Sequence, residues 1–218
     1  IVTEDGSHSL YIREMNETYH STHGALTESQ YVFLKEGVEY TLLQENHQRV
    51  RILEVGFGTG LNALMMLEFA RQHPALSIDY LTLEPFPLSE DLFSRLNFAE
   101  YLPHVMNEEL LRMHEMPSKE EAVFDNFRFL KYQEKVEEVT LNRESEVVFF
   151  DAFAPNKQGE VWNLSVLEKL HDCLVKGGVL VTYCAQGQFK RNLKEAGFEV
   201  ETLKGPPGKK EMVRGIKN

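Results

Sequence analysis

The stretch Arg49-Val-Arg-Ile-Leu-Glu-Val55 runs directly into Gly56-Phe57-Gly58-Thr59-Gly60. The first seven residues form a short, largely apolar run of the kind that makes a buried strand. A mostly apolar segment with helical spacing starts at Leu61 and ends before Pro74. A strand, a glycine-rich turn and a helix in this order are typical of a nucleotide-binding turn, because glycines let a ligand approach the backbone closely.

The rest of the chain repeats this alternation of strand and helix signals. We expect further strands at residues 77–83, 127–132, 147–150, 179–183, 198–203 and 211–216. Helices are expected at residues 90–96, 134–141, 162–174 and 189–196, and residues 97–124 are acidic and helical in pattern. The pattern predicts an α/β, Rossmann-like fold: a mainly parallel seven-stranded sheet with helices on both faces and an antiparallel C-terminal strand.

The alternation also divides the chain into two parts. Residues 1–48 lack it, and we expect them to form an N-terminal cap or lid over the ligand-binding edge of the sheet. Residues 49–218 form the doubly wound domain, with a helical insertion at about residues 89–124. The segment Gly177-Gly178 is expected to be a turn before the fifth strand.

Charge limits the classes of function. The 218 residues carry a net charge of −11, which argues against a protein that coats nucleic acid generally, because phosphate binding relies on Lys and Arg. Basic residues nonetheless outnumber acidic ones in residues 186–218. This C-terminal basic strip either binds a polyanion locally or is a solvated charged face.

The sequence does not indicate membrane insertion, secretion or metal binding. No apolar run approaches ~20 residues, and the acidic first residues contain no secretory signal, so we expect a cytoplasmic protein. Cys173 and Cys184 lie in apolar segments and are expected to be reduced core thiols. The histidines contain no H-E-x-x-H pattern, so we expect no metal.

The glycine turn favours S-adenosylmethionine (AdoMet) as its ligand. Its spacing is G-x-G-x-G, where a dinucleotide site has G-x-G-x-x-G, so NAD-dependent redox chemistry is disfavoured. Acidic residues before the turn and at the end of the second strand suit a ligand that carries an amino acid and a ribose. A purely structural turn is the alternative. The expected cofactor-binding residues are Glu54, Gly56, Phe57, Gly58, Thr59, Gly60, Asn62, Glu84 for the ribose and Glu134 for the adenine.

A second motif, Asp151-Ala-Phe-Ala-Pro-Asn-Lys157, leaves the apolar strand 147–150 at the ligand-binding edge. A carboxylate is costly to bury there unless it has a partner or a function. If an amine accepts a methyl group, its nitrogen becomes cationic, and a nearby carboxylate stabilises that charge or takes the proton. Asp151 is therefore the candidate catalytic residue. The alternative is that Asp151 caps the following turn.

Four segments carry a resemblance to a known family. They are Tyr19-His-Ser21 with Gly24-Ala-Leu-Thr-Glu-Ser-Gln-Tyr-Val-Phe-Leu34; Gly56-Phe-Gly-Thr-Gly-Leu-Asn62; Asp151-Ala-Phe-Ala-Pro155 with Lys157 and Trp162; and Lys204-Gly205 with Lys209-Lys-Glu-Met212. Over nearly its whole length the chain resembles the methyltransferase domain of the bifunctional tRNA 5-methylaminomethyl-2-thiouridine biosynthesis protein family, MnmC. The glycine turn is shared by many class I methyltransferases, whereas the other three segments in this order are fairly specific.

The resemblance implies a class I methyltransferase fold and AdoMet-dependent methylation of the exocyclic amine of 5-aminomethyl-(2-thio)uridine at the tRNA wobble position 34. It places Asp151 at the family's catalytic acid. The family's oxidase half has no counterpart here, so we expect no FAD, and we expect other enzymes to install the 5-aminomethyl group. The family's aromatic-Gly-Arg-Lys element reads Pro207-Gly-Lys-Lys210 in this chain. A monomer is expected.

The partner that this resemblance implies is tRNA. Tyr19, Tyr31 and Phe33 are candidates to stack on an extruded base, with core packing as the alternative for at least one of them. Further candidate substrate or RNA contacts are Phe153, Pro155, Lys157, Lys209 and Lys210. Two other functions stay open: a methyltransferase or aminopropyltransferase that acts on a small-molecule amine, and an inactive binding module in a tRNA-modification complex.

Overall fold

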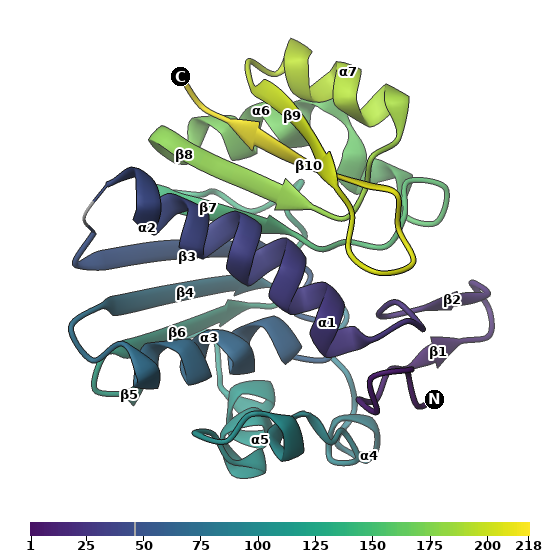
Figure 1. The fold of residues 1–218 in the computed structure, drawn as a ribbon, viewed down its shortest axis with the longest axis vertical. Coiled ribbons are helices and arrows are strands. Elements are labelled where there is room, and N and C mark those ends of the chain that lie inside the picture. Colours follow the sequence, from purple (N-terminus) through teal and green to yellow (C-terminus); the bar gives the residue numbers. More distant parts are fainter. Residues whose placement is uncertain (46) are drawn as a thin grey trace.

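A computed structural model describes residues 1–45 and 47–218, and its centre is one mixed sheet of eight strands (Figure 1). In spatial order the strands are β5 (Glu121–Phe124), β6 (Phe127–Tyr132), β4 (Ser77–Leu83), β3 (Arg49–Val55), β7 (Ser145–Phe150), β8 (Leu174–Thr182), β10 (Glu211–Ile216) and β9 (Glu199–Lys204). The five central strands from β6 to β8 are parallel, whereas β10 is antiparallel to both β8 and β9. The predicted α/β fold is confirmed.

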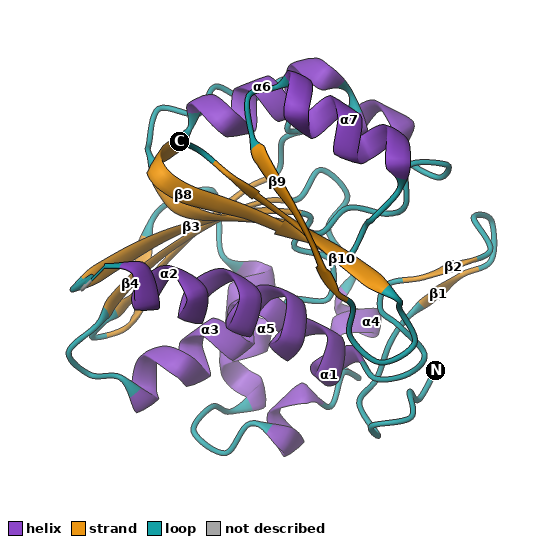
Figure 2. Ribbon diagram, turned by 45° about the horizontal axis from the view of Figure 1, so that its top comes forward, coloured by secondary structure: helices purple, strands orange, loops and turns teal. Residues whose placement is uncertain are grey.

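Helices cover both faces of the sheet (Figure 2). One face carries a continuous helical segment made of α1 (Ala25–Ser29), the π-helical Gln30–Glu39 and α2 (Tyr40–Gln44), together with α3 (Leu61–Gln72) and α5 (Asn107–Glu115). The other face carries α6 (Leu164–Asp172) and α7 (Gly187–Glu195). Each face has its own buried apolar cluster, because strands buried on both sides need a cover on both sides.

The N-terminal residues both pack on the sheet and reach its ligand-binding edge. A short hairpin of β1 (Tyr11–Ile12) and β2 (Glu17–Thr18) precedes α1. Further on, the π-helical segment lies tightly on β7 and β8: a Cβ at Gly37 would lie 3.1 Å from Val181 and 3.3 Å from Phe149. Most of the segment 25–44 is therefore a structural layer. The division of the chain at residue 48 stays a prediction.

Three sequence predictions about the elements are wrong. The structure has eight strands where seven were expected, because residues 121–124 of the predicted helical insertion pair with β6 as strand β5. The insertion also contains the short helix α4 (Glu90–Phe93) and a 3₁₀ turn at Phe98–Tyr101. Gly177 and Gly178, expected in a turn, lie inside β8 beside a register irregularity. Glycines favour such irregularities because they carry no side chain to pack.

The third wrong prediction is the helix at residues 134–141, which form an irregular loop with a turn. Lys169 of α6 explains this conformation. Its Nζ donates to the carbonyl oxygens of Val136, Glu137 and Val139 at 2.8, 2.8 and 3.0 Å. A helix would use most of these carbonyls internally, so the tertiary contact competes with the local helical tendency.

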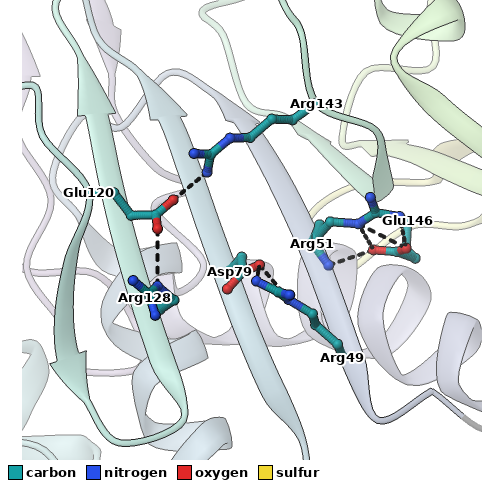
Figure 3. Close-up of polar contacts among 7 residues, drawn as sticks. All are labelled: Arg49, Arg51, Asp79, Glu120, Arg128, Arg143 and Glu146. Atoms are coloured by element: carbon teal, nitrogen blue, oxygen red, sulfur yellow. Dashed lines mark hydrogen bonds and ion pairs between the residues drawn. The ribbon is translucent and has the colours of Figure 1, made fainter.

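Ion pairs link the strands near their amino ends, at the edge opposite the ligand-binding edge (Figure 3). Arg51 pairs with Glu146 of β7 at 2.6 Å, and Arg49 Nε donates to Asp79 of β4 at 2.6 Å. Arg128 and Arg143 share Glu120. The pairs made by the exposed Arg49, Arg128 and Arg143 contribute roughly 0–1 kcal/mol each. Glu146 is buried, so its pair with Arg51 satisfies a charge that would otherwise lack a partner.

Two further features concern cysteines and membranes. Cys173 and Cys184 are free and buried, as predicted. Within residues 1–45 and 47–218 no helix has the length and apolar character that crossing a membrane requires. In the same part of the chain, no three His, Cys, Asp or Glu side chains gather as a metal-binding group.

Candidate functional site

A cavity of about 690 Å³ lies at the carboxyl ends of β3, β4, β7 and β8. This is the edge at which parallel α/β sheets bind their ligands. One part of its wall consists of the glycine turn after β3 and the residues after β4, including Glu84 and Phe86. The other part consists of residues 17–22, Asp151 with the loop that follows it, and Lys209. The predicted glycine turn and the predicted catalytic loop therefore share one cavity.

The turn that follows β3 requires glycine for two reasons. Gly56 and Gly58 have φ angles of +94° and +51°, which L side chains rarely adopt. In addition, a Cβ at Gly56 would lie 2.5 Å from the backbone oxygen of Asp151, and one at Gly58 would lie 3.1 Å from the ring of Tyr19. The bare backbone thus lets the loops after β3 and β7 approach each other and leaves space above the turn.

Glu84 closes the floor of this part of the cavity. Its two carboxylate oxygens accept hydrogen bonds from the backbone N–H groups of Gly58 at 2.7 Å and Phe86 at 2.8 Å. Burial raises the pKa of Glu84, while the two backbone hydrogen bonds and the positive charge of Lys131 oppose that rise. Glu84 thus connects the end of β4 to the glycine turn and still lines the cavity.

Glu54 lies beneath the turn and does not line the cavity. Its Oε1 accepts a hydrogen bond from Asn62 at 3.0 Å, and its Oε2 accepts one from Thr82 at 2.7 Å. The side chain is fully buried, and burial raises its pKa to about 8, with the negative charge of Asp151 acting in the same direction. Glu54 therefore supports Asn62, which does line the cavity.

Asn62 joins the two parts of the site. Its Nδ2 donates to Glu54 Oε1 and also to Asp151 Oδ2, the latter at 2.8 Å. Its Oδ1 is buried and has no hydrogen-bond partner among the described residues. A buried acceptor without a partner is unusual, and here it belongs to a side chain in the cavity wall. Such an atom can accept a hydrogen bond from a ligand.

Asp151 follows β7 directly and faces the cavity. The pKa of Asp151 is raised to about 7: burial and the negative charge of Glu28 raise it, whereas the Asn62 hydrogen bond and the charge of Lys209 lower it. A carboxyl group with a pKa near neutrality exchanges protons at physiological pH. Asp151 is therefore suited to accept a proton.

Aromatic and basic side chains complete the wall beside Asp151. The ring of Tyr19 meets that of Phe153 edge-on, with centroids 5.0 Å apart. Lys157 Nζ donates to the carbonyl oxygen of Met15 at 2.6 Å, which ties the loop after β7 to the N-terminal hairpin. Lys209 Nζ lies 2.5 Å from Glu28 Oε1 and 3.7 Å from the centroid of the Tyr183 ring.

Thr59 is held from both sides by buried histidines. His20 Nε2 lies 2.7 Å from Thr59 Oγ1, and His114 Nε2 donates to the Thr59 carbonyl oxygen at 3.1 Å. Burial lowers the pKa of each histidine to about 4, so both are neutral at physiological pH. The N-terminal segment and α5 thereby fix the conformation of the glycine turn.

The structure does not bring every predicted site residue to the cavity wall. Glu134 is exposed in the loop that follows β6, and Lys210 is exposed beside the inward-facing Lys209. Tyr31 packs under Lys35 on the helical layer, and Phe33 is buried in the core against Phe149. Gly60 and Pro155 belong to the two loops but do not line the cavity.

The cavity is also lined by residues that sequence reasoning did not assign to the site, among them Glu28, His20 and Tyr183. Glu28 and His20 lie in the N-terminal segments that carry the family resemblance, which was the available signal. Tyr183 follows β8 as Asp151 follows β7, so its position at the end of a predicted strand was a second signal.

Comparison with known proteins agrees with the fold and with AdoMet as the cofactor. The chain belongs to a family of S-adenosyl-L-methionine-dependent methyltransferases, whose match covers residues 96–218. Among curated relatives it is similar to the tRNA 5-methylaminomethyl-2-thiouridine biosynthesis bifunctional protein MnmC of Maricaulis maris, with 30% identity over 94% of this chain and 36% of that protein. MnmC of Aliivibrio fischeri is 28% identical over 93% of this chain and 32% of that protein. The chain thus spans about a third of the length of these relatives.

The solved structures give the same result. MNMC2 from Aquifex aeolicus superimposes with a TM-score of 0.83 at 26% identity, covering 99% of this chain and 68% of that chain. Spermidine synthase from Thermotoga maritima, at 11% identity and a TM-score of 0.54 over 92% of this chain and 62% of that chain, shares the fold alone. The predicted resemblance to the MnmC methyltransferase domain, the class I fold and AdoMet as cofactor are confirmed.

Proposed function

We propose that this AdoMet-dependent methyltransferase methylates the exocyclic amine of 5-aminomethyl-(2-thio)uridine at tRNA wobble position 34, giving the 5-methylaminomethyl form. The observation that carries the proposal is the position of Asp151. Its carboxylate faces the same cavity as the glycine turn and is hydrogen-bonded to Asn62 at 2.8 Å. The names of the curated relatives, which are tRNA 5-methylaminomethyl-2-thiouridine biosynthesis proteins, support the choice of acceptor.

The residues around the turn fit the cofactor. The glycine backbone leaves space that a Cβ would fill, and the buried Asn62 Oδ1 without a partner is an acceptor for the cofactor's amino group. The carboxylate of Glu84, at the end of β4, is placed for ribose hydroxyls, as the acid in this position is in related α/β folds. Bound AdoMet supplies an electrophilic methyl group on a positively charged sulfur.

Asp151 then acts on the acceptor. An alkylammonium ion has no lone pair, so the substrate amine must lose a proton before it attacks, and it becomes cationic again as the new N–C bond forms. Because the pKa of Asp151 is about 7, its carboxylate is substantially ionised at neutral pH and can take a proton from the nitrogen. Before that, its negative charge orients the amine and stabilises the developing positive charge.

The aromatic wall suits a nucleobase. Tyr19 and Phe153 meet edge-on beside Asp151, and flat apolar surfaces of this kind receive bases that leave the stack. The product of this reaction is a secondary amine on an already modified uridine, so another enzyme must first install the 5-aminomethyl group. The functional partners are therefore tRNA and the enzymes that make this precursor.

The test uses tRNA that carries unmethylated 5-aminomethyl-2-thiouridine, incubated with the protein and AdoMet and then digested to nucleosides for mass spectrometry. We expect the 5-aminomethyl nucleoside to gain one methyl group, and tRNA without the aminomethyl group to gain none. Asp151→Asn should lower kcat by about 10²-fold or more, whereas its AdoMet Kd, measured by calorimetry, should change little. The proposal is overturned if the wild-type protein binds AdoMet but the 5-aminomethyl nucleoside of the tRNA gains no methyl group.

One observation favours a second acceptor class. Carboxylates from four further residues line the cavity, namely Glu17, Glu28, Glu137 and Glu160, and an acidic cavity attracts small cationic amines. A methyltransferase or aminopropyltransferase that acts on a small-molecule amine is therefore the alternative. The same assay is repeated with free di- and polyamines in place of RNA. Product that forms with these amines and not with tRNA would select the small-molecule alternative.

A further inference from the structure

An ion pair from distant parts of the chain lies in the cavity wall beside Asp151. Glu28 is in α1, and its buried carboxylate accepts a hydrogen bond from the Ser21 N–H through Oε2 at 3.0 Å. Its Oε1 lies 2.5 Å from Lys209 Nζ. The same ammonium group lies 3.7 Å above the ring centroid of Tyr183, whose Oη donates to the carbonyl oxygen of Ala152 at 2.7 Å. The cluster therefore touches the residue next to Asp151.

The loop between β9 and β10 directs Lys209 inwards. Gly205 N–H donates to the Lys210 carbonyl oxygen at 3.1 Å, and Lys209 N–H donates to the Pro206 carbonyl oxygen at 2.9 Å. This tight loop leaves Lys210 exposed, whereas Lys209 lines the cavity. The two adjacent lysines therefore have different surroundings. A phosphate-binding role on the surface fits Lys210 better than Lys209.

Without Lys209, the Glu28 and Asp151 carboxylates, which both act on Tyr183, would lack the positive charge that this lysine supplies. Neighbouring carboxylates favour a shared proton, because like charges in a poorly solvated site cannot both ionise freely. The groups that act on Asp151 come from several elements: Glu28 from α1, Glu54 from β3, Asn62 from α3, Tyr183 after β8 and Lys209 before β10. Among them Lys209 supplies the positive charge.

We propose that Glu28 and Lys209 are positioning residues for methyl transfer: their ion pair, packed on Tyr183, neutralises the Glu28 carboxylate in the cavity wall and leaves Asp151 to serve the acceptor amine. This inference rests on the proposed role of Asp151. It assigns Lys209 a function inside the cavity instead of on the RNA-binding surface. It also explains why Glu28 is buried at a position where an unpaired carboxylate would be costly.

The test first follows the ionisation of Asp151 without any acceptor. Selective ¹³C labelling of aspartate carboxyl groups, with the Asp151 signal assigned by Asp151→Asn, gives its titration midpoint by NMR. Lys209→Met should raise that midpoint by about one unit or more, and Glu28→Gln should lower it by a similar amount. Lys209→Arg should restore the wild-type value. Lys176→Met removes the same charge from an exposed position on β8 and is the matched control.

A further comparison protects the test against misfolding. Lys209→Met alone leaves the Glu28 carboxylate unpaired, so Glu28→Gln is compared with the double variant Glu28→Gln/Lys209→Met, in which no unpaired carboxylate remains. The double variant should titrate at higher pH than the single one. The control sets the limit for both comparisons. The proposal is overturned if Lys209→Met shifts the Asp151 midpoint no more than Lys176→Met does, either in the wild type or in the Glu28→Gln background.

The second readout is the pH dependence of kcat/KM for methyl transfer to tRNA. Its acidic limb should move in the same direction as the Asp151 midpoint in each variant. The two readouts separate the two proposals. If the midpoints move as expected but tRNA receives no methyl group, the acceptor assignment fails and the electrostatic role of the pair stands. If methylation occurs but the midpoints do not move, the role of the pair fails alone.

Discussion

Asn62 Nδ2 lies 2.8 Å from Asp151 Oδ2, and the same amide nitrogen lies 3.0 Å from Glu54 Oε1. One buried amide thus donates to two carboxylates that come from neighbouring parallel strands. Because the hydrogen bond stabilises the ionised form of Asp151, it opposes the effect of burial on the pKa of that group. The position of Asn62, in the first turn of α3, couples the glycine turn to the proposed proton acceptor.

Replacing Asn62 with Leu should therefore impair the reaction mainly by changing Asp151. Without the amide donor the pKa of Asp151 rises from about 7, and the ionised fraction at pH 7 falls about fivefold for the first unit of increase and about tenfold for each further unit. We expect kcat at pH 7 to fall by about that factor or more and to recover partly at higher pH. The measurement is kcat against pH.

Asn192→Leu, which removes an amide from α7, is the control for this experiment. Among the described residues the Asn192 side chain has one hydrogen bond, which it accepts from Gln188. If the acidic limb of the kcat–pH profile does not move in Asn62→Leu, Asn62 does not set the ionisation of Asp151. Loss of AdoMet binding without a shift of the limb would instead assign Asn62 to the cofactor alone.

The glycine turn yields a prediction with a steric cause. In Gly56→Ala the new methyl group would approach the Asp151 backbone oxygen to 2.5 Å at a φ of +94°. The three nearest atoms, from Asp151 and Ala152, all belong to the backbone, so none can move aside cheaply. Strained conformations of this kind cost about 1–3 kcal/mol. We expect a lower Tm and at least a tenfold weaker AdoMet Kd by calorimetry. Gly187→Ala, at the start of α7 with only an ordinary contact, should leave the Tm unchanged or slightly higher; equal stability of the two variants would argue against the close approach.

The sequence predicts the parts of the site that depend on local pattern. The apolar run Val147–Phe150 predicts a buried strand, and that strand places Asp151 at the cavity; the turn Gly56–Gly60 likewise follows from its spacing. The Glu28–Lys209 pair joins opposite ends of the chain through the antiparallel order of β8, β10 and β9, which no local pattern contains. Residues 134–141 form a loop and not the expected helix, because Lys169 donates hydrogen bonds to three of its carbonyl oxygens. Glu134, expected near the adenine because it follows the strand 127–132, is exposed.

Burial of Glu54 should make stability depend on pH. Its pKa in the folded protein is raised to about 8 from 4.5, and that of Asp151 is raised to about 7 from 3.8. In this range the folded state binds more protons than the unfolded state, so the free energy of unfolding falls as pH rises towards 8. His20 and His114, with pKa values lowered to about 4 from 6.5, act in the opposite sense, but only below pH 6.5.

Between pH 6.5 and pH 8 the carboxyl groups titrate in the folded state, but burial lowers the pKa of Lys131 to about 8 from 10.5, which opposes their effect near the upper limit. The contribution of Glu54 is therefore obtained by comparison with a variant. Glu54→Gln keeps an acceptor for Asn62 and removes the titration, so the variant should lose less stability than the wild type across this window and exceed it at pH 8. Urea unfolding at both pH values measures this. If the free energy of unfolding changes equally with pH in Glu54→Gln and in the wild type, Glu54 does not titrate in this pH range.

The exposed Lys210 gives the last prediction, which concerns RNA. If the C-terminal basic strip binds the tRNA backbone, Lys210→Ala removes about one phosphate contact. It should then weaken tRNA binding at low salt and reduce the slope of log Kd against log salt concentration by about one. AdoMet binding and the Asp151 titration should not change, because Lys210 lies outside the cavity wall. Lys176→Ala, an equal charge change elsewhere on the surface, should leave the slope as it is. Identical slopes for Lys210→Ala and the wild type would show that this lysine belongs to a solvated charged face and does not contact the RNA.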